Sequence, residues 1–72
     1  MTAATRAEDW IRTFAEEIGV EAPSQEEMDE ILRLAAVAAH ASERIAAPIA
    51  CWLAGTSGRP LGEAREAAEG LG

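Results

Sequence analysis

The residues of this chain that could do chemistry gather in one stretch, HASERIAAPIACW, which begins at His40. His40, Glu43 and Arg44 all precede a proline that suits the start of a new helix. Free amides at a helix start, beside an imidazole and a guanidinium, would bind a phosphate or a carboxylate. In the structural alternative, the Glu43 carboxylate, a backbone carbonyl or water satisfies the same amides. Both interpretations fit the sequence.

Cys51 and His40 are the pair in this stretch that could act as nucleophile and base. Such a cysteine needs a pocket that favours the thiolate, and the sequence indicates none. Cys51 beside Trp52 is typical of a core residue. His40, Glu43 and Cys51 lack the spacing of a zinc site. We therefore predict no metal and no cofactor, and a small enzyme using Cys51 and His40 stays a minor alternative.

Four other residues of the same region have structural roles in our interpretation. Ser42 falls within an apolar stripe, where its hydroxyl can bond a carbonyl one turn back. Pro48 is expected to break or kink the helix. Trp52 is predicted to anchor the core together with Trp10, and Gly55 to end the helix that contains Trp52.

Composition indicates that helices alone position these residues. The 72 residues include 17 alanines, and all six basic residues are arginines. Alanine, arginine, glutamate and leucine have high helix propensity, whereas residues that favour strands are sparse. A chain of this length makes one small domain. We therefore predict a single all-α domain over residues 1–72.

Apolar spacing and capping signals predict four helices, at about residues 5–18, 25–45, 48–54 and 61–69. Thr5 with Glu8 forms a capping box at the first helix, which ends at Gly19. Ser24 with Glu27 forms the box of the second helix. These signals predict a four-helix domain with the break between the second and third helices at the proline.

The second predicted helix is apolar on two sides. Its main stripe contains Met28, Leu32, Ala35, Ala39 and Ala46. A second strip on the opposite side contains Leu34, Val37, Ala41 and Ile45. A helix that is apolar on both sides is usually buried on both. The second helix is therefore predicted to be central, or to pair its second strip with the same strip of another copy.

Charge and cysteine content exclude several classes of function. The net charge of −7 argues against a nucleic-acid partner, which needs clustered basic residues. The single cysteine cannot form an internal disulfide, which fits a reducing compartment. The longest apolar run, residues 34–39, is too short to span a membrane, and no signal peptide is evident. We therefore expect a cytoplasmic protein.

The segments AHASERIAAPIACWLAG, APSQEEMDEILRLA and WIRTFAEEIGV resemble a family of small bacterial domains of unknown function. Those domains occur alone or attached to molybdenum cofactor guanylyltransferase-like proteins. The resemblance covers roughly residues 10–68, and the last predicted helix matches more loosely, with Gly62 where a better helix former is expected. The transferase itself has a glycine-rich phosphate loop on an α/β sheet, and this chain has neither.

The resemblance implies an accessory role in molybdopterin guanine dinucleotide biosynthesis, with a guanylyltransferase-like protein as partner. Together with the residues above, it predicts a non-catalytic interaction module. His40, Glu43 and Arg44 would then form a contact patch for a partner protein or a phosphate-bearing ligand. The alternative from another functional class is a homodimerisation module without a ligand.

Overall fold

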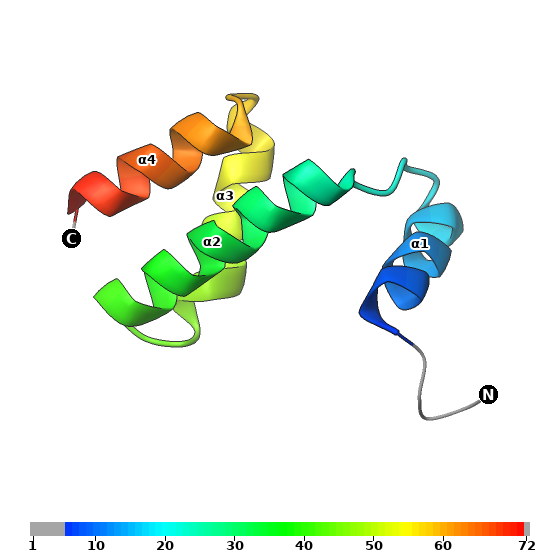
Figure 1. Cartoon of the computed structure of the whole chain (residues 1–72), viewed down its shortest axis with the longest axis horizontal. Helices are drawn as coiled ribbons and strands as arrows, with labels where there is room; N and C mark the ends of the chain where they lie inside the picture. Colours follow the sequence, from blue (N-terminus) through cyan, green and yellow to red (C-terminus); the bar gives the residue numbers. More distant parts are fainter. Residues whose placement is uncertain (1–5, 72) are drawn as a thin grey trace.

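The computed structural model describes residues 6–71, and it folds them into four helices without a strand (Figure 1). In chain order these are α1 (Ala7–Ile18), α2 (Gln25–Ala41), α3 (Ala46–Ser57) and α4 (Leu61–Leu71). The predicted all-α class and the four helices are confirmed, and α2 contacts both α3 and α4. In this part of the chain, no helix has the length and apolar character needed to cross a membrane.

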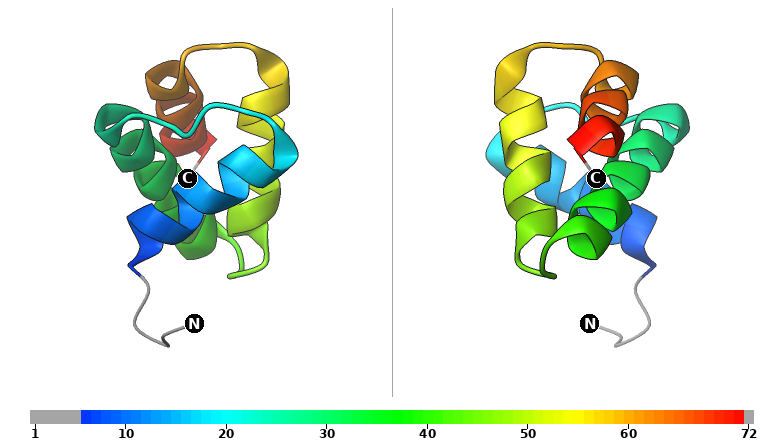
Figure 2. Two further views of the ribbon diagram at one scale, coloured as in Figure 1. Left: turned by 90° about the vertical axis from the view of Figure 1, so that its right-hand side faces the viewer. Right: turned by 90° about the vertical axis from the view of Figure 1, so that its left-hand side faces the viewer.

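Helices α2, α3 and α4 pack together, and we call them the three-helix unit. α2 lies against both of the others, whereas α3 and α4 touch each other much less. α1 stands apart from this unit, because none of its Cα atoms lies within 8 Å of a Cα atom of another helix. Viewed along the long axis, α1 lies across one end of the three-helix unit (Figure 2). The molecule is therefore elongated, with extents of 40 × 25 × 18 Å.

The buried core is small. In the three-helix unit it consists of Leu34 on α2 and Ala54 on α3, which are 3% and 7% exposed. Leu34 belongs to the predicted second strip, whereas Leu32 of the predicted main stripe is exposed. The assignment of the two tryptophans to the core is wrong, because Trp10 is 54% exposed and Trp52 is 67% exposed. Small side chains allow the helices to approach, and the tryptophans remain outside.

The ends of α1 and α2 follow from local hydrogen bonds. Gly19 adopts a left-handed conformation with φ of 78°. The amide of Val20 then reaches back to the Ala15 carbonyl at 2.9 Å, which is the bond that closes a Schellman motif. At α2, the Ser24 hydroxyl accepts from the Glu27 amide at 3.1 Å, and the Glu27 carboxylate accepts from the Ser24 amide at 2.8 Å. The capping box of α2 is therefore confirmed.

Helix α1 begins without a side-chain cap among the described residues. Its N-cap residue is Arg6, whose side chain makes no capping hydrogen bond. Thr5, which the sequence pattern assigns to a capping box, lies outside the residues that the structure describes.

The break between α2 and α3 lies upstream of the position predicted for it. α2 ends at Ala41 with Ser42 as its C-cap, and α3 begins at Ala46 after a connection of four residues, ahead of Pro48. Pro48 is the third residue of α3, where a missing amide costs no intrahelical bond. Gly55 lies inside α3, and Gly58 ends the helix with φ of 74°. The predicted roles of Pro48 as the break and Gly55 as the terminator are therefore wrong.

Candidate functional site

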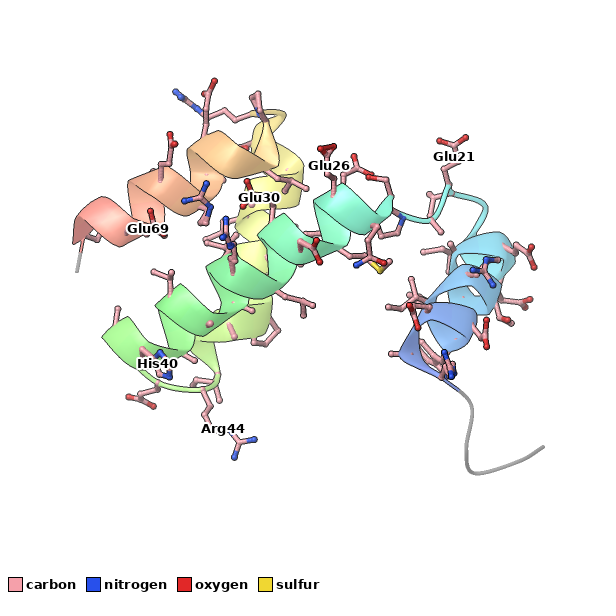
Figure 3. The ribbon with its side chains drawn as sticks, viewed as in Figure 1. Glu21, Glu26, Glu30, His40, Arg44 and Glu69 are labelled. Carbon is pink, nitrogen blue, oxygen red and sulfur yellow. The ribbon has the colours of Figure 1, made fainter. Side chains whose placement is uncertain are left out.

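His40 and Arg44 lie on different elements. His40 is in the last turn of α2, and Arg44 is in the turn at residues 42–45. Their predicted common face needed a helix that continues to Arg44, so that prediction is wrong. Both side chains are exposed, as is Glu43 between them, and Arg44 extends away from the turn (Figure 3). Within residues 6–71, none of the three takes part in an ion pair.

The amides at the start of α3 already have acceptors. The Ala46 amide donates to the Glu43 carbonyl at 2.9 Å, and the Ala47 amide donates to the Arg44 carbonyl at 3.1 Å. Pro48 follows and has no N–H. The amides from Ala50 onward lie inside α3, where carbonyls one turn back accept them. The first two amides of α3 are therefore used by the preceding turn, so an anion bound here would be held mainly by side chains.

Cys51 packs in the contact between α3 and α2. Its thiol donates to the Ile31 carbonyl at 3.7 Å and is partly buried. Burial raises the pKa of the Cys51 thiol, which reduces the thiolate fraction at neutral pH. Among the described residues, no group of three histidine, cysteine or carboxylate side chains could hold a metal ion. This environment is typical of a packing cysteine.

A cluster of charged residues that the sequence interpretation missed joins α2 to α4. Glu30 on α2 accepts from Arg65 on α4 at 2.7 Å and 3.3 Å, a two-pronged contact. Arg65 also donates to Glu69 at 3.1 Å. The hydrogen bond from Arg65 is the main cause that lowers the pKa of the Glu30 carboxyl, with the charges of Arg65 and Arg33 adding to it. The cluster fixes α4 on α2, so its role is structural.

Gly62 has a packing role beneath the same cluster. A Cβ atom at this position would lie 3.1 Å from the Glu30 carboxylate. A glycine therefore occurs inside α4 because the ion pair passes close to the backbone there. The sequence interpretation noted the residue but had no reason for it, since Glu30 and Gly62 are far apart in the chain.

One side of α1 is apolar and exposed. Trp10, Phe14 and Ile18 follow one another at four-residue spacing, and all three are about half exposed or more. The rings of Trp10 and Phe14 stack with their centroids 5.2 Å apart. We call these three residues the α1 stripe. No other helix has a Cα atom within 8 Å of α1.

The outer side of α3 is also apolar and exposed. α3 contains no charged residue, and its Ala54 and Cys51 side packs toward α2. The opposite side, which we call the α3 face, consists of Ile45, Ile49, Trp52 and Leu53, all exposed. A helix that is apolar all round is normally covered on all sides. The absence of charge in this segment was a signal in the sequence that could have identified the α3 face.

A shallow groove of about 330 Å³ runs between α1 and the start of α2. Its lining is mostly apolar and includes Ile11, Pro23, Met28 and Leu32. Few polar groups converge on it, so it lacks the placed donors and acceptors that orient a small-molecule ligand.

Comparison with known proteins gives a family and no activity. The family model described as "Domain of unknown function (DUF6457)" matches residues 2–71. Neither the curated proteins nor the solved structures contain a match. Nothing in these comparisons links the chain to molybdenum cofactor proteins.

Proposed function

The chain belongs to the DUF6457 family of domains of unknown function, and we propose from its geometry that it is a non-catalytic module that binds a partner protein. The observation that carries the proposal is the α3 face. Three large apolar side chains, Ile49, Trp52 and Leu53, are more than half exposed on a helix without charge. Aromatic residues on an exposed apolar surface are the usual centre of a protein–protein contact.

The resemblance of the sequence to domains attached to molybdenum cofactor guanylyltransferase-like proteins suggests one such protein as the partner. The resemblance alone supports this choice. The lone, partly buried Cys51 agrees with a reducing compartment, so we place the module in the cytoplasm.

The partner can be tested with isotope-labelled full chain and a purified guanylyltransferase-like protein. We expect NMR signals of the α3 face to shift or broaden on mixing, and the Trp52→Glu variant to lose the effect. Leu71→Glu is the matched control, because Leu71 is 90% exposed on α4, away from the α3 face. Unchanged spectra at 100 µM of each protein, a concentration at which even weak complexes form, would remove this partner.

We also keep the contact patch of His40, Glu43 and Arg44 as the place where a phosphate-bearing group of the partner or a free ligand would bind. Arg44 carries the positive charge of this turn, the His40 imidazole lies just before it at the end of α2, and the amides of Ala46 and Ala47 are occupied. Titration with pyrophosphate should shift the signals of His40 and Arg44, and Arg44→Gln should weaken the shift. A titration without any shift at these two residues would remove the ligand version and leave the protein-binding proposal intact.

A further inference from the structure

We infer that, in the free protein, a second copy of the chain covers the α3 face by placing its α1 stripe there, and that the exchange is reciprocal. This inference rests on the proposed function, because it names an occupant for the same face. The resulting contact is a two-fold symmetric dimer in which each copy contributes both halves of the interface.

The exposed area of the chain is the first argument. A compact monomer of 7.6 kDa exposes about 4,300 Å², whereas this chain exposes 5767 Å². The excess is about 1,500 Å², and a specific interface covers about 800 Å² on each partner. The uncovered surface is therefore large enough for a stable dimer.

The second argument is that the two uncovered faces match each other. α1 and α3 each have 12 residues, so one can lie along the full length of the other. The α3 face contains no charged side chain, whereas Glu17 lies at the edge of the α1 stripe beside Trp10 and Phe14. The Asp9–Arg12 ion pair lies on another side of α1. Packing the two faces together would therefore bury apolar surface and leave the Glu17 carboxylate at the rim of the contact, where water still reaches it.

The position of α1 explains why the occupant comes from another copy. The Schellman motif at Gly19 and the rigid ring of Pro23 direct the chain from α1 into the start of α2 (Figure 1). No Cα atom of α1 comes within 8 Å of α3 in the same chain. The outer sides of α2 and α4 are rich in glutamate, so they do not suit the α1 stripe.

Sedimentation equilibrium of the full chain between 10 and 500 µM, a range that includes typical weak self-association, is the first measurement. We expect a dimer whose dissociation constant rises at least about 30-fold with Trp52→Glu or with Phe14→Glu, the loss typical of a central interface residue. Leu71→Glu should leave the dimer unchanged. Circular dichroism checks that each variant is helical, and Leu53→Glu replaces Trp52→Glu if the latter does not fold.

Mixing the two variants separates reciprocal exchange from other dimers. In a mixed pair, the intact α1 stripe of the Trp52→Glu chain meets the intact α3 face of the Phe14→Glu chain. One of the two contacts is then restored, so the mixture should dimerise more tightly than either variant alone. A wild-type dimer whose variants show no rescue on mixing would overturn the exchange.

Acrylamide quenching of tryptophan fluorescence distinguishes the two ways in which a monomer could arise. A monomer with quencher-accessible tryptophans would overturn the second copy as occupant, while leaving the α3 face open for the partner of the proposed function. A monomer with both tryptophans shielded would mean that α1 covers its own α3, which would overturn both proposals.

Discussion

α1 and the three-helix unit are stabilised by different kinds of contact. In the unit, residues distant in sequence meet, as Leu34 does with its neighbours in the core and Glu30 does with Arg65. α1 buries Ala15 and lines a groove with the start of α2, while its largest side chains, Trp10 and Phe14, stack on each other and stay exposed. A helix of 12 residues is marginal in water on its own. The comparison indicates that its own chain leaves the large apolar side chains of α1 exposed, whereas the three helices of the unit cover one another.

Leu34→Ala is expected to cause the largest loss of stability. Trp10→Ala is the substitution to which it is compared. Leu34 is almost fully buried, so its truncation should lower the free energy of unfolding by about 2–5 kcal/mol at any protein concentration. Trp10 is exposed within its own chain, so Trp10→Ala should cost more as the concentration rises and the dimer forms. Urea unfolding at two protein concentrations measures both. A concentration-independent loss for Trp10→Ala would contradict the comparison.

Two glycines with nearly the same backbone conformation test whether α1 and the three-helix unit differ in stability, with smaller expected changes in the free energy of unfolding. Gly58 ends α3 and Gly19 ends α1, with φ of 74° and 78°. Alanine at either position should strain the left-handed cap by about 1 kcal/mol. Gly58→Ala should lower global stability by that amount, because the α3–α4 connection belongs to the three-helix unit.

Gly19→Ala should act mainly on α1 in dilute solution. We expect faster hydrogen exchange of the last amides of α1 and little change in the urea midpoint of the unit. Equal shifts of the midpoint for the two variants would mean that α1 and the unit unfold together, which would remove the distinction between them.

The sequence predicted the elements well because their signals are local. The Ser24–Glu27 capping box and the cap at Gly19 depend on residues within one turn, and both are present. The position of the α2–α3 break was missed because Pro48 was taken as the cause. The preceding turn at residues 42–45 ends α2 first, and the proline then fits the first turn of α3.

What the sequence did not reveal depends on contacts between distant segments. Glu30 and Arg65 are separated by 35 positions, and no spacing rule connects them. The two tryptophans were assigned to the core because large apolar residues are usually buried. The rule that large apolar residues are buried applies to a protein together with everything that binds it. In this chain, the large apolar side chains are more numerous than a single copy can bury. The contact patch of His40, Glu43 and Arg44 stays a prediction.

Alanine substitutions at two helical glycines should have different effects on stability. Gly55 has open space where a Cβ atom would lie, so Gly55→Ala should stabilise the chain by about 0.5–1 kcal/mol through helix propensity. Gly62→Ala should gain less or lose stability, because its Cβ atom would press on the Glu30 carboxylate. Thermal unfolding measures both variants. When Glu30 is also replaced by alanine, Gly62→Ala should stabilise the chain as Gly55→Ala does. If Gly62→Ala does not stabilise the Glu30→Ala variant, the carboxylate is not the cause of the difference.

The smallest effect is the acid dependence of the contact between α2 and α4. Because Arg65 lowers the pKa of Glu30 in the folded chain, the ion pair contributes fully above the ordinary glutamate pKa of 4.5. That contribution should fade as the pH falls below 4.5 and through the lower folded pKa. The stability difference between wild type and Glu30→Gln should therefore be largest near neutral pH and shrink toward pH 3, the acid end of this window. Glu66→Gln removes the same charge from an exposed position of α4 and is the matched control for the loss of one carboxylate. A difference between wild type and Glu30→Gln that stays constant from pH 7 to 3 would mean that packing by the side chain, and not its charge, fixes α4 on α2.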